Sequence, residues 1–146
     1  MIKFYSIKGE FGEFSNFFKA EFKVGGKKYH SSEHYYQSQK FVNTDPDWAE
    51  RIRKSATCRE SADMGRDKTH KINPNWEKIK ENVMRVALHE KFTQNENLRK
   101  ILLDTGEEDL VEQSYRDSYW GDGGDGTGKN RLGKLLVELR TQIRGV

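Results

Sequence analysis

The sequence has little cysteine and no long apolar run, and each shortage excludes a class of protein. Cys58 is the only cysteine, so it cannot form an internal disulfide and makes a poor metal site. We expect a buried or semi-buried thiol there. No apolar stretch approaches the roughly 20 residues that span a bilayer, and the opening MIKFYSIKGE lacks the apolar core of a secretory signal. These absences predict a cytoplasmic protein, or a nuclear one in a eukaryote, without a membrane partner.

Neither sign of charge dominates the sequence. The 26 basic and 23 acidic residues are intermixed and leave a net charge of only +3, which is not typical of a protein that coats nucleic acid. A short stretch of nucleic acid or an anionic small molecule remains compatible with this balance. The four histidines are His30, His34, His70 and His89. Their spacing is not that of metal ligands, and we expect no metal and no cofactor.

Length and composition predict one folded domain over residues 1–146. A chain of 146 residues can bury one sizeable core but hardly two. Hydrophobic and charged residues each make up 34%, and three Trp, six Tyr and eight Phe supply much of the area that can be buried. We therefore expect a packed domain with a strongly polar surface.

Short alternating stretches predict the strands. Residues 22–24 and 27–29 alternate on either side of Gly25-Gly26, a spacing typical of a β-hairpin. Residues 2–4 alternate in the same way, and residues 109–113 alternate weakly enough to form only a short strand. The predicted sheet content is small.

Capping residues and the two prolines predict the helix starts. In chain order these are Ser31-Ser32 before a helix through Phe41, Asp45-Pro46, the Thr57 and Glu60 capping box of a helix ended by Gly65, Asn73-Pro74, Asn95 before a helix ending at Gly106, and Asn130. Apolar residues recur at helical spacing after most of these signals. They are Trp48, Ile52 and Ala56; Trp76, Ile79, Val83, Val86 and Ala87; Leu98, Ile101 and Leu102; and Leu132, Leu135, Leu136, Leu139 and Ile143. The pattern predicts a mainly helical α+β domain.

Three polar residues of the first predicted helix share one face. Glu33, Gln37 and Lys40 stand at i, i+4 and i+7, so their side chains can address one substrate. The same spacing also suits an ordinary solvent-facing stripe, and spacing alone does not choose between the two.

A glycine-rich segment, WGDGGDGTGKN, precedes the last predicted helix. Its glycines let the backbone approach a ligand, and the N–H groups at the start of the helix can bind phosphate. Asp122 and Asp125 oppose an anion, and neither a Walker nor a dinucleotide-binding pattern is met. A plain loop is the alternative.

A carboxylate stands beside aromatic residues just before the glycine-rich segment, at Asp117, Tyr119 and Trp120. This combination suits stabilisation of an oxocarbenium ion, although such a tryptophan is often only part of the core.

Several segments together resemble one family across nearly the whole chain. They are GEFGEFSNFF (9–18), SSEHYYQSQKF (31–41), MGRD (64–67), NPNW (73–76), the VM...L..KF.QN run (83–95), LLDTG (102–106), LVEQS (110–114) and DSYWGDGGDGTGKNRLGKLL (117–136). Their order and content resemble the NADAR family, also called YbiA-like. The resemblance implies a compact, mainly helical α+β fold and hydrolysis of N-glycosidic bonds. The substrates it implies are phosphoribosylamino-pyrimidine intermediates of riboflavin biosynthesis and ADP-ribose on the amino group of guanine in DNA or RNA.

The resemblance also implies roles for individual residues. Glu33 would activate water or relay a proton, Lys40 would attack the opened sugar or hold a ribose hydroxyl or phosphate, and Asp117 would stabilise positive charge on the sugar. The residues implied to bind substrate are Asn16, Arg66, Trp76, Trp120, Gly121, Gly128, Asn130 and Gly133. A non-catalytic module that binds ADP-ribose or a related nucleotide is the alternative. A binding module would have little need for Glu33, Lys40 and Asp117 together.

Overall fold

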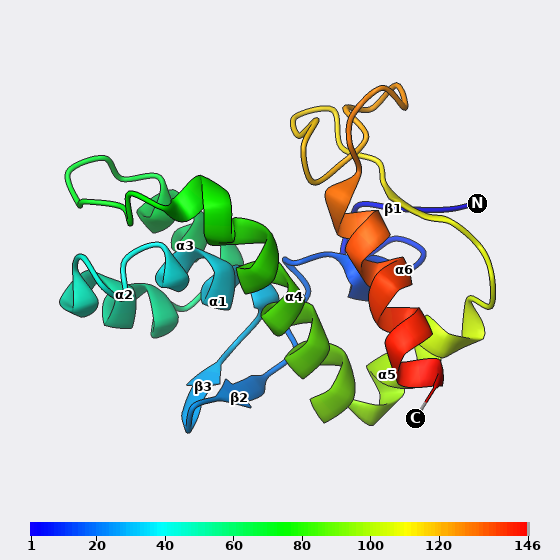
Figure 1. Ribbon diagram of the computed structural model, residues 1–146, viewed down its shortest axis with the longest axis horizontal. Coiled ribbons are helices and arrows are strands. Elements are labelled where there is room, and N and C mark those ends of the chain that lie inside the picture. The colour runs from blue at the N-terminus through cyan, green and yellow to red at the C-terminus, as the bar shows by residue number, and fades with distance from the viewer. Residues whose placement is uncertain (146) are drawn as a thin grey trace. The chain divides into compact units, whose positions relative to one another are not determined.

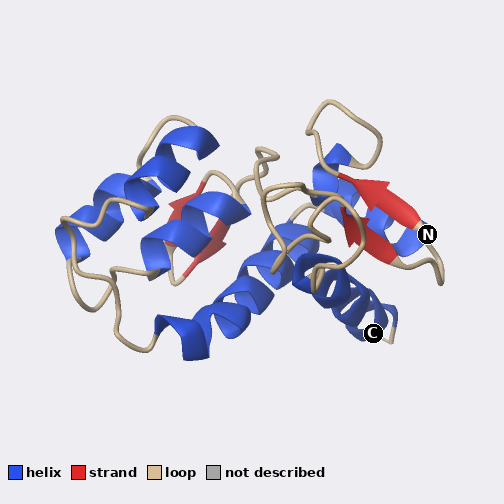
Figure 2. Ribbon diagram, turned by 90° about the horizontal axis from the view of Figure 1, so that it is seen from above, coloured by secondary structure: helices blue, strands red, loops and turns tan. Residues whose placement is uncertain are grey.

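The computed structural model describes residues 1–145 and has the mainly helical α+β fold expected from the sequence (Figures 1 and 2). The helices are η1 (Gly12–Phe14), α1 (Ser32–Gln39), α2 (Pro46–Arg53), α3 (Cys58–Gly65), α4 (Trp76–Gln94), α5 (Glu96–Asp104) and α6 (Arg131–Arg144). The strands are β1 (Ile2–Phe4), β2 (Phe22–Val24), β3 (Lys27–Tyr29) and β4 (Leu110–Glu112). None of the helices described is long and apolar enough to cross a bilayer.

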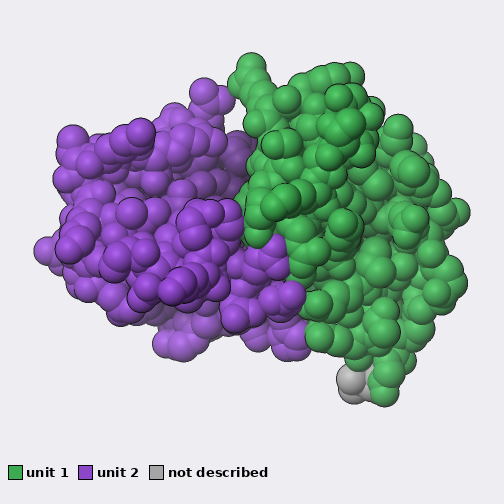
Figure 3. All heavy atoms as spheres, turned by 45° about the horizontal axis from the view of Figure 1, so that its top comes forward, with its two compact units in different colours: residues 1–15, 96–146 green, residues 16–95 purple. Residues whose placement is uncertain are grey.

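The chain forms two compact units, coloured separately in Figure 3. Unit 2 comprises Asn16–Asn95, and unit 1 comprises residues 1–15 with the described part of 96–146. The three polar residues that the sequence singled out on and just after α1, Glu33, Gln37 and Lys40, all fall in unit 2, whereas the glycine-rich segment falls in unit 1.

Helix α1 is the centre of unit 2. It packs against α2, α3 and α4, and residues 32–38 are all buried although most of them are polar. The predicted hairpin is confirmed, because β2 and β3 pair antiparallel with Phe22 opposite Tyr29. The rings of this pair stack at 6.0 Å and contact Tyr35 of α1. Aromatic packing thus fixes α1 against the hairpin.

Unit 1 is built around a parallel strand pair and α6. Strand β1 pairs with β4 so that Ile2 lies opposite Leu110. The apolar stripe predicted for α6 is confirmed, since its five members are buried. Gly133 lies against β4, where an added Cβ would be 1.9 Å from the Leu110 carbonyl oxygen. The absence of a side chain at Gly133 is what lets α6 pack so closely on the strand.

Several predicted caps are confirmed, and others were wrong. Ser31, Asp45 and Thr57 each accept a hydrogen bond from a backbone N–H in the first turn of the helix that follows. Asn73 does not cap α4. Its Oδ1 instead accepts from the Asn75 N–H, 2.8 Å away, in a local turn, and the helix begins at Trp76. Asn130 precedes α6 as expected but makes no side-chain cap.

The asparagine before α6 binds a strand instead. Asn130 donates from Nδ2 to the Leu110 carbonyl at 2.9 Å and accepts the Glu112 N–H at Oδ1, also at 2.9 Å. A left-handed backbone, with φ of 50°, turns the side chain toward β4. Asparagine tolerates this conformation better than most residues. Asn130 therefore joins the end of the glycine-rich segment to the sheet.

Two apolar faces also differ from the prediction. Ala56 lies beyond the end of α2 and is exposed, because that helix ends at Arg53. Val86 of α4 is exposed, whereas Met84 and Leu88 are buried with Ala87. Apolar spacing alone did not fix which neighbouring residues of this long helix face the core.

Replacing Gly133 with alanine should loosen the contact between α6 and β4. The new methyl group would overlap the Leu110 carbonyl, so we expect the free energy of unfolding to fall by about 2 kcal/mol or more, despite the better helix propensity of alanine. Urea denaturation would measure the change. Gly145→Ala is the control, since its Cβ would meet nothing closer than 3.7 Å. Equal stability of the two variants would contradict this account of Gly133.

Candidate functional site

A buried carboxylate and amide face each other on α1. The side chains of Glu33 and Gln37 are 7% and 5% exposed, and Gln37 Nε2 donates to Glu33 Oε2 at 2.7 Å. The solvent-facing alternative for this part of the helix is therefore wrong. Burying a carboxylate is costly unless hydrogen bonds or charges compensate it, which makes Glu33 a functional-site candidate on physical grounds.

The segment before the hairpin fixes the start of α1. The backbone carbonyl of Asn16 accepts the Glu33 N–H at 3.2 Å, and Asn16 Oδ1 accepts the Ser32 hydroxyl at 2.7 Å. Both bonds satisfy groups in the first turn that have no partner inside the helix. Asn16, predicted to bind ribose or phosphate, lies beside Glu33 and positions its peptide group.

Gly65, at the end of α3, leaves room for Gln37. A Cβ at this glycine would lie 1.9 Å from Gln37 Oε1. That oxygen is buried and has no hydrogen-bond partner among the described residues. Gln37 thus presents a free acceptor while its amide nitrogen is bonded to Glu33. From the sequence it was seen only as a member of the spacing pattern.

Lys40 lies where α1 has just ended, beside two aromatic rings. Its Nζ is 5.6 Å from the ring centroid of Tyr36 and 5.9 Å from that of Trp76, and the two rings meet edge to face at 5.1 Å. Burial lowers the pKa of Lys40, while the nearby charge of Glu33 opposes this shift. A larger fraction of this amine is neutral than in an exposed lysine, which is what a nucleophile needs. Tyr36 was not predicted, although its i, i+4 spacing from Lys40 could have indicated the contact.

Two other predicted substrate-binding residues of unit 2 differ in exposure. Trp76 is 6% exposed and packs on Tyr36, so it belongs to the core beneath Lys40. Arg66 is exposed and lies 3.5 Å from the Asp63 carboxylate. Its positive charge contributes to the lowered pKa of Lys40. Contact of either residue with substrate stays a prediction.

Asp117, in unit 1, organises a turn. Its Oδ1 accepts the N–H of Tyr119 at 3.0 Å and of Trp120 at 2.8 Å. The two rings lie edge to face at 4.9 Å, and Lys129 Nζ is 5.5 Å from the Tyr119 ring. Asp117 and Trp120 are both half-buried. The carboxylate thus binds the backbone of the two aromatic residues, and its role at a positively charged sugar stays a prediction.

Backbone hydrogen bonds hold the glycine-rich segment, both within it, as from the Gly128 N–H to the Asp122 carbonyl at 2.8 Å, and to the residues on either side. The N–H groups of Arg131 and Leu132 donate to the carbonyls of Tyr119 and Trp120 at 2.9 and 3.0 Å. The expectation that free N–H groups at the start of α6 would bind phosphate is wrong for these two groups, because the preceding turn occupies them.

The glycines of the segment allow close approach of the chain to itself. A Cβ at Gly121 would lie 2.8 Å from the Asp117 carbonyl oxygen, and one at Gly128 would lie 2.7 Å from the Gly121 carbonyl oxygen. Gly133 approaches β4 in the same manner. Internal packing accounts for these three glycines, and their contact with substrate stays a prediction.

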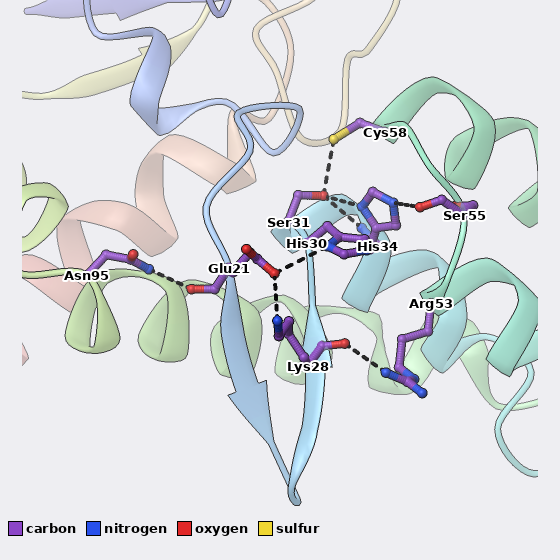
Figure 4. A network of polar contacts seen from close by, with 9 residues as sticks. All are labelled: Glu21, Lys28, His30, Ser31, His34, Arg53, Ser55, Cys58 and Asn95. Atoms are coloured by element: carbon purple, nitrogen blue, oxygen red, sulfur yellow. Dashed lines mark hydrogen bonds and ion pairs between the residues drawn. The ribbon is translucent and has the colours of Figure 1, made fainter.

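A chain of polar contacts anchors the N-terminus of α1 (Figure 4). His34 Nε2 lies 3.0 Å from the Ser55 carbonyl oxygen, which can only accept, so this nitrogen carries the proton. His34 Nδ1 therefore accepts from the Ser31 hydroxyl at 2.7 Å. The Cys58 thiol lies 3.2 Å from the same hydroxyl, and it is semi-buried as expected. A neutral histidine thus supports the cap of the helix that carries Glu33.

The family model for the NADAR domain matches residues 3–144. The chain belongs to the NADAR family. The match runs through both compact units. Among the described residues of this NADAR domain, no group of three or more His, Cys, Asp and Glu side chains lies together as a metal site would require.

Curated relatives cover nearly the whole chain. N-glycosidase YbiA of Escherichia coli K12 is 50% identical over 143 residues, covering 98% of this chain and 88% of that protein. The NMR structure of E. coli YbiA matches with a TM-score of 0.90, covering 98% of this chain and 84% of that one. An N-glycosidase of Nostoc punctiforme is 39% identical, with coverage of 99% and 94%. A riboflavin biosynthesis protein of Vibrio vulnificus is 37% identical, but the match covers only 38% of that longer protein.

Acid should destabilise this NADAR domain through His34. Burial lowers the pKa of His34, against the bond to Ser55 that favours the charged ring. The neutral ring contributes fully to stability when the pH is above the pKa of histidine in the unfolded chain, about 6.5. This contribution is lost as the pH falls from there toward the lower pKa of His34 in the folded protein. Unfolding free energies from urea titrations at pH 8 to 5 would measure the slope. His34→Gln should flatten it, whereas His89→Gln, at an exposed site on α4, should not. A slope unchanged in His34→Gln would contradict the assignment.

Proposed function

We propose that this chain is an N-glycosidase that hydrolyses the bond between C1′ of a ribose and an exocyclic amine. The buried Glu33–Gln37 pair on α1, adjoining the desolvated Lys40, is the observation that carries the proposal. A module that only binds a nucleotide gains nothing from burying a carboxylate beside a lysine with a lowered pKa. The names N-glycosidase and riboflavin biosynthesis protein among the relatives support the same class of reaction.

The substrate is a ribosyl group on an amino nitrogen outside the base ring. A phosphoribosylamino-pyrimidine is the first candidate, because one relative is named for riboflavin biosynthesis. ADP-ribose on the amino group of guanine in DNA or RNA presents the same C1′–N bond. Such a glycosylamine can open without breaking that bond. Cleavage of O4′–C1′, with transfer of the amine proton to O4′, leaves a C1′=N imine.

Glu33 is positioned to act as the general base. In the imine route, the carboxylate removes a proton from water as the water oxygen bonds to C1′. The imine nitrogen takes up that proton, which gives the carbinolamine. As the carbinolamine collapses, the C1′–N bond breaks, the hydroxyl proton passes to the departing amine, and the sugar is left as the aldehyde, which closes again to ribose. Gln37 holds the carboxylate in place by its 2.7 Å hydrogen bond.

Lys40 offers a covalent version of the same step. Its neutral Nζ adds to C1′ of the imine, both Nζ protons pass to the nitrogen of the base, and the C1′–N bond breaks so that the base departs as the amine. The Lys40–sugar imine that remains is hydrolysed by water that Glu33 activates. Asp117, beside Trp120, is proposed to stabilise positive charge that develops on the sugar. Arg66 is proposed to bind a substrate phosphate.

Glu33→Gln should remove turnover and leave binding. The amide keeps the size and hydrogen-bonding capacity of the side chain but cannot accept the proton from water, so we expect kcat to fall by about 10²- to 10⁴-fold. Mass spectrometry of released base and sugar would follow two substrates, a phosphoribosylamino-pyrimidine and an oligonucleotide carrying ADP-ribose on guanine. Asp47→Asn, at an exposed position of α2, is the control. Wild-type activity in Glu33→Gln would contradict its role as base, and binding of both substrates without turnover by the wild type would favour the non-catalytic module.

Reduction should trap the sugar on Lys40. If the covalent route operates, cyanoborohydride added during turnover reduces the Lys40–sugar imine to a stable amine, and peptide mass spectrometry finds the adduct on that residue. Because burial lowers its pKa, trapping should begin at a lower pH than for an exposed lysine. Lys54 is exposed and serves as the internal control. Turnover without an adduct on Lys40 would leave direct attack by water as the mechanism.

A further inference from the structure

A second lysine of unit 2 is completely buried. Lys91 of α4 is 0% exposed, and its Nζ lies 5.9 Å from the ring centroid of Phe18 and 5.2 Å from that of Phe92. Aromatic rings attract an ammonium ion but do not neutralise it. A lysine removed entirely from water either loses its proton or is paired with an anion. If Lys91 keeps its proton, a buried carboxylate has to lie within reach of its ammonium group.

Three consecutive residues connect Lys91 to the first turn of α1. The carbonyl of Asn16 accepts the Glu33 N–H at 3.2 Å. The carbonyl oxygen of Phe17 lies 3.3 Å from the Cys58 sulfur, and the ring of Phe18 lies over Lys91. Helices α1 and α4 also pack directly on each other. The segment thus contacts both the backbone of Glu33 and the side chain of Lys91, and both of these residues are buried.

The thiol of Cys58 responds to both charges. Burial is the main cause that raises the pKa of Cys58, and the hydrogen bond to Ser31 opposes it. Glu33 raises this pKa further, whereas Lys91 lowers it. Coulombic effects of this kind require the charges to lie near the group. The opposite effects of Glu33 and Lys91 on the Cys58 pKa agree with the contacts that the 16–18 segment makes with Glu33, Cys58 and Lys91.

We propose that the Lys91 ammonium is the buried counter-ion of the Glu33 carboxylate, and that it is a positioning residue that keeps Glu33 ionised and oriented. Lys91 is fully buried, so its effect on substrate is exerted through Glu33. The catalytic consequence rests on the proposed function, in which Glu33 is the base. The pairing itself does not depend on it, and the two parts are tested separately.

A double-mutant cycle on stability tests the pairing. Lys91→Met keeps an unbranched chain of similar length but leaves Glu33 without its counter-ion, and Glu33→Gln removes the charge from the other side. The losses of unfolding free energy in the two single variants should not add up in the double variant. We expect its unfolding equilibrium constant to be at least about tenfold smaller than additive effects would give. Additive effects would overturn the proposal. If Lys91→Met does not fold, a folded double variant supports the pairing, and an unfolded one overturns it.

The rate–pH profile tests the catalytic consequence. Among the described residues, Glu33 bears on the pKa values of Lys40 and Cys58, His34 follows it on α1, and Lys91 of α4 is its proposed counter-ion. Without its counter-ion, the buried carboxylate of Glu33 takes up a proton more readily, so the acidic limb of kcat/KM should move upward by about one pH unit or more in Lys91→Met.

Lys78→Met, an exposed position of the same helix, is the matched control and should leave the acidic limb in place. A Lys91→Met variant that loses rate equally at every pH, with an unmoved acidic limb, would overturn the ionisation role. If the wild type turns over neither substrate, the proposed function fails, and the stability cycle still decides whether Glu33 and Lys91 form a pair.

Discussion

The hydrogen bond between Glu33 and Gln37 is the constraint on which the rest of unit 2 depends. A carboxylate that is 7% exposed is stable only if its surroundings are already arranged to bind it. Asn16 fixes the first turn of α1, and Gly65 leaves the space that Gln37 occupies. Helices α2, α3 and α4 enclose α1 on its other sides. A mainly polar helix lies at the centre of this unit because its polar side chains bind one another rather than water.

The glycine-rich segment obeys a different constraint. Its backbone groups bond to one another and to neighbouring residues such as Glu112, whose carbonyl accepts the Asp122 N–H, and Asp117 and Asn130 hold its two ends through side-chain bonds to the main chain. Gly128 and Gly133 are required by close contacts inside unit 1. Conformational freedom is therefore a poor description of this loop. The N–H groups of Arg131 and Leu132 at the start of α6 are already occupied, and contact of Asp117 and Trp120 with substrate stays a prediction.

Local signals predicted local structure well. The caps at Asp45 and Thr57 and the apolar stripe of α6 depend only on neighbouring residues, and all were confirmed. Tertiary facts were not accessible in this way. Spacing placed Glu33 beside Gln37 but could not tell whether their face met water or other helices. Lysine is rarely buried, so nothing in the sequence distinguished Lys91 from an ordinary surface residue.

In the proposed mechanism Lys40 and Lys91 make opposite demands on Glu33, because Lys40 has to be neutral and Lys91 has to be charged. Lys40 is useful as a nucleophile only while burial keeps its pKa low, yet the charge of Glu33 raises that pKa. A separate ammonium beside Glu33 would neutralise much of the carboxylate's field at Lys40. Desolvation over Tyr36 and Trp76 could then dominate the protonation of Lys40, while Glu33 stays ionised to activate water. On this view a completely buried Lys91 is what allows a base and a reactive amine to lie two helical turns apart.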